Sequence, residues 1–329
     1  MQWIFDSVCL NVNLQQLRSV RETLRRGFNL TAVAQALHTS QSGVSRQIRE
    51  LEEELGIEIF VRDGKRLTGL TDPGRSVVPI VERLLDEAEN LRRAGANYAS
   101  AGKGTLRVAA THSQARYALP AVVRDFRAAH PDVRLHMHQG SPTQVAQMLL
   151  DGDADLGVAT EALAHYEDLV ALPCYRWTHK VIVPPQHALA IDARDGKTLD
   201  LATLAKYPII TYETGYTGRA HIDDAFRAAG LEPDVALVAM DADVIKTYVE
   251  LGMGVGIVAA IAYDEERDRH LAAIDARHLF APNMTRIGLK RGTYLRDYTY
   301  AFIETFAPPW TRALVEGALS TPPGTVIES

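Results

Sequence analysis

Four consecutive polar residues, Thr111, His112, Ser113 and Gln114, stand where a short apolar run meets a helical pattern. The run 106–110 predicts a buried strand, and the pattern after it predicts a helix over about 115–130. The first N–H groups of a helix have no partner within the helix and lie at the positive end of its dipole. Together with neutral hydroxyl and amide donors, they predict a site for a small anion such as a carboxylate or sulfate.

Two further threonines have positions that suit this site. Thr160 follows the apolar run 156–159, and α/β folds bind ligands at the carboxyl ends of such strands. Thr217 lies in a glycine-flanked loop of a later run of strands and helices, from which it could close over a ligand. A lone threonine more often caps a helix or bonds at a strand edge, so that alternative stays open. His112 could instead point outward, and Arg116 and Arg219 could neutralise an anion or lie in solvent.

A second set of polar residues falls on the first turn and a half of a helix predicted from Gln41, with Ser40 as its N-cap and Gly56 as its stop. The major groove of DNA admits one helix whose N-terminal side chains face the base edges. Gln pairs with adenine, Arg pairs with guanine, and Ser suits bases or phosphate. The predicted DNA contacts are Thr39, Gln41, Ser42, Ser45, Arg46, Arg49, Arg62, Lys65 and Arg66.

The last three of these residues lie on a predicted hairpin. Residues 57–62 read as a strand, Asp63-Gly64 is a two-residue turn signal, and 66–71 form the returning strand. A basic hairpin tip can meet phosphate or the minor groove. The alternative for Arg46 and Arg49 is that they are solvated and pair with nearby glutamates of the same helix.

Composition and charge exclude several classes of protein. The formal net charge of −6 argues against bulk electrostatic binding to nucleic acid. Residues 13–74 carry nine Lys and Arg against eight Asp and Glu, about +1, so the placement of these charges must matter more than their sum. Cys9 and Cys174 have no metal-type spacing, which favours a reducing, cytoplasmic compartment. No P-loop, zinc-protease or paired-cysteine motif is present, no metal or cofactor is predicted, and no apolar stretch would span a membrane. We therefore expect neither an enzyme nor a membrane protein.

The elements that must position these residues fall into three parts. Helices and a hairpin fill residues 13–71, and a long helix follows over 72–103. Its apolar positions Val77, Val81, Leu84, Ala88 and Leu91 are spaced as a heptad seam, suited to packing against a second copy. From 104 to 310, strands and helices alternate in two similar runs, which predicts parallel sheets arranged as two lobes. Lobe I is expected at about 104–175 and 278–310, and lobe II at about 176–277.

The stretch 30–52, LTAVAQALHTSQSGVSRQIRELE, closely resembles the LysR-type transcriptional regulators. The resemblance extends from Asn13 to about Phe306 in the family's domain order. It implies an α/β fold class: a winged helix-turn-helix, a linker and dimerisation helix, and a two-lobed effector domain like a periplasmic binding protein. Residues 1–12 are then an extra segment, with Val12 an alternative start, and 311–329 are a C-terminal tail that is loose from Thr321.

Shorter matches resemble one branch of that family, the cysteine-regulon activators and their sulfur-control relatives. They are THSQARYALP at 111–120, ATEAL at 159–163, TGR at 217–219 and DADVIKTYV at 241–249. By this resemblance the effector pocket is lined by Thr111, His112, Ser113, Gln114, Thr160 and Thr217. Ser113 stands where the family has Thr, and Glu213 places a carboxylate close to the pocket.

The resemblance also implies partners and a function. The partners are double-stranded operator DNA, a second or fourth copy of the chain, RNA polymerase, and a small anionic effector of the N-acetylserine, O-acetylserine, sulfate or thiosulfate class. The function is control of genes for sulfur assimilation and cysteine biosynthesis. Two alternatives remain: control of genes for sulfonates and other sulfur sources, and an anion-binding protein with no role at DNA.

Overall fold

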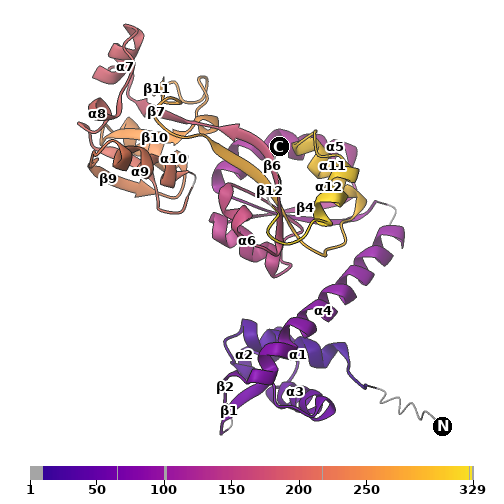
Figure 1. The fold of residues 1–329 in the computed structure, drawn as a ribbon. Coiled ribbons are helices and arrows are strands. Elements are labelled where there is room, and N and C mark those ends of the chain that lie inside the picture. The colour runs from indigo at the N-terminus through magenta and orange to yellow at the C-terminus, as the bar shows by residue number, and fades with distance from the viewer. Residues whose placement is uncertain (1–9, 65, 100–101, 217, 326, 328–329) are drawn as a thin grey trace, which may run out of the picture. The chain divides into compact units, whose positions relative to one another are not determined.

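The computed structural model describes residues 10–64, 66–99, 102–216, 218–325 and 327. The chain divides into two compact units, residues 1–96 and 97–329 (Figure 1). Each unit has its own buried core. No helix in these ranges is both long enough and apolar enough to cross a bilayer.

The N-terminal unit is built on three helices, α1 (Leu14–Arg25), α2 (Leu30–Ala36) and α3 (Gln41–Leu55). Each begins at a polar cap. Asn13 and Asn29 accept from the first N–H groups of α1 and α2, and the Ser40 hydroxyl accepts from Gly43 N at 3.0 Å. Gly56 ends α3 in the left-handed conformation, as predicted from the sequence. The predicted helix-turn-helix is therefore confirmed.

A hairpin and a long helix complete this part of the fold. Strands β1 (Phe60–Asp63) and β2 (Arg66–Leu70) pair antiparallel, and α4 runs over Asp72–Ala99. The start of α4 lies directly against the hairpin, because a Cβ at Gly74 would come within 2.1 Å of the Ile59 carbonyl oxygen. The helix continues past Gly95 and fills most of the predicted span 72–103.

Lobe I of the C-terminal unit is a five-stranded sheet in the order β4-β3-β5-β12-β6. Helices α5 and α11 pack on each other over one apolar cluster, and α6 covers a second, separate cluster (Figure 1). Its elements are β3 (Gly104–Ala110), η1 (Gln114–Ala118), α5 (Leu119–Ala129), β4 (Val133–Gln139), α6 (Pro142–Leu150), β5 (Leu156–Ala159), η2 (Glu161–His165), β6 (Leu169–Trp177), β12 (Asn283–Lys290), α11 (Asp297–Phe306) and α12 (Arg312–Leu319).

Lobe II is a second five-stranded sheet, in the order β11-β7-β10-β8-β9. Its buried side chains also form two clusters, one of which includes Ile222 and Phe226 of α9. Its elements are β7 (His179–Val183), α7 (Ala188–Arg194), α8 (Leu201–Leu204), β8 (Ile209–Tyr212), α9 (Arg219–Ala228), β9 (Val235–Ala239), α10 (Ala242–Glu250), β10 (Val255–Ala259), η3 (Ala260–Ala262) and β11 (Ala272–Asp275).

Both sheets are mixed, which corrects the prediction of parallel sheets. In each lobe three neighbouring strands run parallel, but β12 is antiparallel to β5 and β6, and β7 is antiparallel to β10 and β11. The cause is the crossing of the chain between lobes at residues 177–179 and again before Asn283. The return of the strand at 285–289 to lobe I agrees with the sequence analysis.

The segment after residue 310 is more ordered than a loose tail. Helix α12 places Val315 and Ala318 in the core of lobe I. Beyond it, Arg291 Nη1 donates to the Thr321 carbonyl at 2.5 Å. Residues 311–327, where described, therefore belong to lobe I, because apolar residues at helical spacing in α12 have a sheet face to cover.

Candidate functional site

The predicted anion donors of lobe I lie together at one edge of its sheet. β3 and β5 are parallel neighbours, with Ala110 opposite Val158. The next residues in each strand direction, Thr111 and Thr160, therefore leave the sheet at the same edge. The Thr111 amide still bonds to the Val158 carbonyl at 3.2 Å. The side chains of Thr111, Ser113, Gln114 and Thr160 are all buried.

The helix after Thr111 begins with an irregular turn. Residues 114–118 form a π-helical turn, η1, before α5 starts at Leu119. The Leu119 amide donates to the Gln114 carbonyl, five residues back. Such turns are rare and occur frequently at functional sites. Arg116 and Tyr117, which both contact lobe II, lie in this turn.

Gln114 and Ser113 play different parts at this edge. The Gln114 Nε2 donates to Thr285 Oγ1 at 3.1 Å, and its Oε1 accepts from the Tyr175 hydroxyl at 2.6 Å. Both ends of this amide are thus occupied by lobe I, so Gln114 braces the helix start against β12 and β6. The Ser113 hydroxyl is buried close to the phenol of Tyr212 in lobe II and makes no regular hydrogen bond among the described residues. It remains a donor for a ligand.

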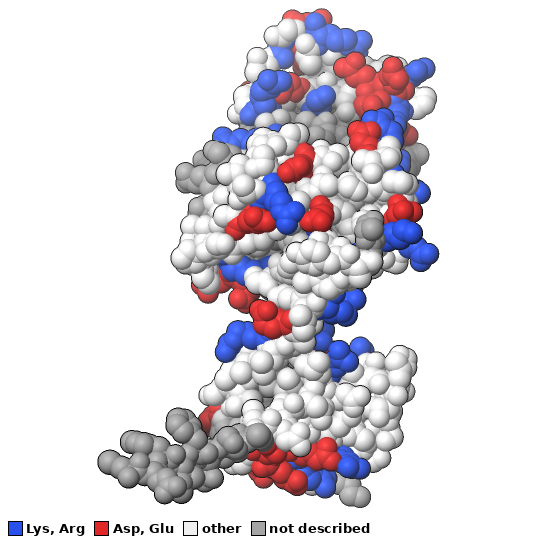
Figure 2. Space-filling view, turned by 90° about the vertical axis from the view of Figure 1, so that its right-hand side faces the viewer, with Lys and Arg blue, Asp and Glu red and all other residues white. Residues whose placement is uncertain are grey.

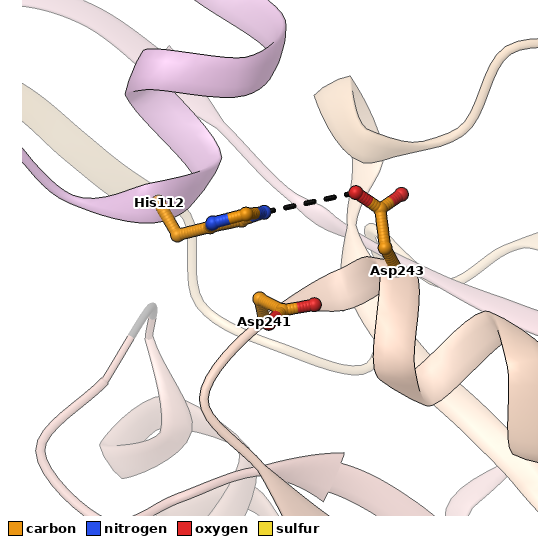
Figure 3. A group of neighbouring side chains, drawn as sticks. All are labelled: His112, Asp241 and Asp243. Carbon is orange, nitrogen blue, oxygen red and sulfur yellow. Dashed lines mark ion pairs between the residues drawn. The ribbon is translucent and has the colours of Figure 1, made fainter. Parts of the chain in front are cut away.

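One carboxylate of lobe II, Asp243 near the start of α10, contacts several groups of lobe I. The Tyr117 hydroxyl donates to Asp243 Oδ1 at 2.7 Å, and Arg116 Nε lies 3.3 Å from Oδ2. The His112 ring faces the same carboxylate, with Nε2 3.7 Å from Oδ2 (Figure 3). We call these four residues the interlobe contact.

The electrostatics of the interlobe contact favour a charged Asp243. Burial alone would raise its pKa, but the Tyr117 hydroxyl, Lys246 and Arg116 lower the pKa below its ordinary value. Lys246 itself is held by Asp268, with Nζ 2.9 Å from Oδ2. Burial and the bond to Asp243 raise the pKa of Tyr117 far above its usual range, so that phenol is a permanent donor at neutral pH.

His112, Asp241 and Asp243 also form the one group among the described residues with the spacing of metal ligands. One ligand atom from each lies within 4.8 Å of the others (Figure 3). The donor set is nevertheless poor, because Asp243 already lies beside the cations of Arg116 and Lys246. Asp241 in turn caps α10, accepting from Val244 N at 2.9 Å. These contacts describe an interlobe contact better than a metal centre.

The other predicted residues of the effector site are accounted for as follows. Thr217 lies outside the described residues. Arg219 makes its hydrogen bonds within lobe II, where it donates to the Tyr212 carbonyl at 2.6 Å and to Asp223 at 2.7 Å. Burial raises the pKa of the Cys174 thiol to about 12, so that thiol is not a nucleophile at neutral pH.

On the DNA-binding unit, the predicted recognition residues of α3 are exposed except for the half-buried Ser45. Arg46 pairs with Glu50 at 2.7 Å, and its side chain is 80% exposed. This is the pairing that the sequence left open as an alternative. Such an exposed pair is weak in water and gives way readily to a phosphate or a base.

One of the three DNA contacts predicted on the β1–β2 hairpin, Arg62, has a structural role. The Glu52 carboxylate is only 7% exposed and accepts from Ile59 N at 2.9 Å and Phe60 N at 3.2 Å. Arg62 Nη2 donates to the other oxygen of Glu52 at 2.6 Å. Arg62 thus anchors the base of the hairpin to α3. Arg66 is exposed, and Lys65 lies outside the described residues.

Helix α4 divides its apolar residues between two faces. Val78, Val81 and Leu85 are buried in the core of the N-terminal unit. Leu84 and Leu91 are 50% and 77% exposed. Val81 is therefore a core residue, and the predicted seam was wrong in including it. The exposed stripe of α4 comprises Ile80, Leu84, Leu91 and Tyr98.

Several polar residues around the lobe crossing were not among the candidates predicted from the sequence. Trp177 and Asn283, opposite each other on β6 and β12, are buried, and their side-chain polar atoms have no partner among the described residues. Asp243 lay within a quoted stretch, but its carboxylate was given no role. A carboxylate in the first turn of a predicted helix gave a weak signal, and a single asparagine before an apolar strand gave none.

Two regulatory domains in one chain, one for DNA and one for a ligand, define the class of protein. The model of the bacterial regulatory helix-turn-helix protein, lysR family, matches residues 14–75, and that of the LysR substrate binding domain matches residues 99–308. The chain belongs to the LysR family of bacterial transcription regulators, which bind DNA through the helix-turn-helix and are not enzymes.

Individual relatives place the chain more finely. It is 56% identical to the HTH-type transcriptional regulator SsuR of Burkholderia cenocepacia, over 94% of this chain and 99% of that one. It is 53% identical to the regulator CysB of the same organism, over 94% and 97%. The cofactor-binding domain of the Cbl transcriptional regulator superposes with a TM-score of 0.63 at 43% identity, covering 67% of this chain and 95% of that one. The predicted resemblance to CysB and its sulfur-control relatives is confirmed.

Proposed function

We propose that this regulator controls genes of sulfur assimilation and cysteine biosynthesis in response to a small anionic effector bound between its two lobes. The relatives named above support the sulfur pathway. The effector class is supported by the donors at the edge of the lobe I sheet. These residues, Thr111, Ser113 and Thr160, are neutral and buried; the first two lie at the start of a helix, and Thr160 follows the neighbouring strand β5. Such a site holds an anion through hydrogen bonds and a helix dipole, without a paired arginine.

The proposed signal passes through the closure of the lobes. The interlobe contact already ties the helix start of lobe I to α10 of lobe II. A ligand that contacts both lobes would favour the same closed arrangement. It can change DNA binding only through its different affinities for the two arrangements, and DNA must change ligand affinity by the same factor.

We further propose that the chain acts on operator DNA as a dimer or tetramer. The exposed stripe of α4 is apolar and runs along one face, as expected of a helix that pairs with its symmetry mate. Pairing would present two α3 helices to two half-sites, where Gln41, Ser42, Ser45 and Arg46 would face bases. Thr39, Arg49, Arg66 and Lys65 would contact the backbone.

Substitution of Thr111 tests the effector site. Thr111→Val keeps the shape of the side chain but removes its hydroxyl donor. We expect it to weaken anion binding about 3- to 10-fold, the effect of one lost hydrogen bond, while operator affinity without ligand stays nearly unchanged. Calorimetry with sulfate, thiosulfate and N-acetylserine measures the affinity of each candidate.

A matched control lies in the same lobe. Thr305→Val removes a hydroxyl on the exposed face of α11, where it bonds to the Ala301 carbonyl, and should leave anion affinity unchanged. If wild type binds none of the three anions, or if Thr111→Val binds them as tightly as wild type, the assigned effector site is wrong, while the assignment to the LysR family stands.

A further inference from the structure

Asn283, the first residue of β12, carries a buried amide that makes no hydrogen bond within the part of the chain that the structure describes. The residue is 1% exposed, and neither Oδ1 nor Nδ2 has a hydrogen-bond partner among the described residues. Native proteins pair nearly all such groups, because leaving one unpaired costs free energy comparable to a lost hydrogen bond. An unpaired amide in this setting indicates a partner that is a ligand or a water.

The position of Asn283 on β12 places it beside the effector site. Side chains alternate along a strand, so Asn283 and Thr285 share one face. Thr285 is the residue that accepts from Gln114 Nε2, at the helix start where the anion donors lie. The unpaired amide therefore lies two residues before Thr285 on the same face of the strand, beside the proposed effector site.

Contact with lobe II is equally direct. A Cβ at Gly218 would lie 2.4 Å from Asn283 Oδ1 and 2.6 Å from Nδ2, so a glycine is required at this point. Gly218 has a φ of +70° and immediately precedes α9. The ring of His221 in α9 also lies 3.1 Å from the Ala281 carbonyl, which fixes this helix start beside the first residues of β12. Asn283 thus sits where the lobes meet.

We propose that Asn283 binds the effector and selects its chemical class, an inference that rests on the proposed function. An amide presents a donor and an acceptor side by side. Sulfate or thiosulfate at neutral pH offers acceptors only, so it would pair Nδ2 and leave Oδ1 buried and unpaired. A ligand with a donor next to its acidic group, such as a hydroxyl or an amide N–H, would pair both atoms. The effector is therefore an organic anion with a neighbouring donor.

The test compares two probes on one variant. Asn283→Leu replaces the amide with an apolar group of similar size. N-acetylserine carries a carboxylate with an amide N–H and a hydroxyl nearby, whereas sulfate carries acceptors only. We expect the affinity of the variant for N-acetylserine to fall about 10-fold or more and its affinity for sulfate to change less than about 3-fold.

A stability measurement separates a ligand-binding role from a structural one. Replacement of an unpaired buried polar group by an apolar one of the same shape is nearly neutral or stabilising. The melting temperature of ligand-free Asn283→Leu should therefore equal or exceed that of wild type. A lower melting temperature with unchanged affinities would show that buried water serves the amide, and would overturn the proposal.

The remaining outcomes are also decisive. Met284→Leu, on the opposite face of β12, is the control and should leave both affinities unchanged. If Asn283→Leu does not fold, Asn283→Ala is judged by the same ratio of affinities. Equal losses for both probes, or a wild type that binds sulfate but not N-acetylserine, refute the role of Asn283 and leave the proposed function intact. A wild type that binds neither probe refutes the proposed function itself.

Discussion

The two binding regions of this chain present their polar groups in opposite ways. On α3, residues such as Gln41 and Arg46 extend into solvent, and the one strong contact of Arg46 is an exposed pair with Glu50. At the proposed effector site, Thr111, Ser113 and Asn283 are buried, and the last two have side-chain polar atoms without a regular hydrogen bond among the described residues. The DNA-binding side chains of α3 are therefore exposed at the surface, whereas those of the proposed effector site are enclosed by the protein.

This difference follows from the size and charge of the two ligands. DNA is large, and its phosphates bind through long-range attraction to exposed cations. Acidic and basic side chains are nonetheless interspersed over the face of the C-terminal unit drawn in Figure 2, so no broad single-sign field steers a ligand there. A small anion must be held by close donors, and burial makes each donor count for more because its unpaired state is costly.

The largest expected effect separates assembly from both binding regions. Leu84→Asp places a charge on the exposed stripe of α4. If that stripe is the dimer interface, the variant should be monomeric and should lose about 10²- to 10⁴-fold in operator affinity, because two linked half-site contacts become one. Light scattering and operator titration measure both effects. Ile191→Asp, at another exposed apolar residue, is the control. A wild-type monomer at micromolar concentration would contradict the dimer.

The second prediction concerns stability of the DNA-binding unit alone. Glu52→Ala removes the acceptor shared by Ile59 N, Phe60 N and Arg62. It should lower the free energy of unfolding of this unit by about 2–4 kcal/mol, because two backbone donors lose a charged partner. Denaturant unfolding measures the change. The exposed neighbour Glu53→Ala should stay within about 0.5 kcal/mol of wild type. Equal effects of the two variants would refute the role of Glu52.

The third prediction concerns base recognition. Arg46→Ala should cost about 1–3 kcal/mol of operator binding and relax base preference at one position, if Arg46 leaves Glu50 for a base. Arg49→Ala should weaken all sequences alike and reduce the salt slope by about one, as expected of a phosphate contact. Titrations at several salt concentrations measure both. Unchanged specificity in Arg46→Ala would remove it from the recognition face.

The smallest expected effect lies in the interlobe contact. Asp243→Asn keeps an acceptor for Tyr117 but removes the negative charge that pairs with Arg116 and faces the His112 ring. Effector affinity should fall about two- to fivefold, the effect of a partly exposed pair, and less at high salt. Asp275→Asn, which breaks a pair with Arg277 inside lobe II, is the control. A gain in affinity would show that Asp243 competes with the effector.

The pH dependence of that contact follows from the lowered pKa of Asp243. A depressed carboxyl pKa means that the contribution of the contact is present above the ordinary value of about 3.9 and is lost as the pH falls through the lowered pKa. With His112 replaced by Gln, which removes the imidazole that faces this carboxylate, calorimetry from pH 6 to 8 should show no change in effector affinity that depends on Asp243. A change within this range that disappears in Asp243→Asn would contradict the lowered pKa.

Local signals in the sequence were enough for much of this molecule. Caps such as Ser40 and Gly56, and the strand before Thr111, act through neighbouring backbone, so a single sequence reveals them. Parallel sheets were wrongly predicted because the direction of β7 and β12 depends on where the chain crosses between lobes. Likewise, Val81 was predicted on the seam but lies in the core, because helical spacing does not show which face of α4 the rest of the N-terminal unit covers. The proposed role of Asn283 depends on its place beside Thr285 and Gly218. Gly218 is distant in the sequence, so no short sequence pattern contains that arrangement.

The central position of β12 has a consequence for the order in which the chain folds. This strand lies between β5 and β6, although residues 283–290 are made after the whole of lobe II. During synthesis the N-terminal unit can fold as soon as it emerges, whereas lobe I must wait with a gap in its sheet until lobe II has left the ribosome. Contacts between such distant segments also slow folding. A chain that stops before Asn283 would therefore expose two unpaired strand edges in lobe I, which makes late truncation a route to aggregation rather than to a smaller working regulator.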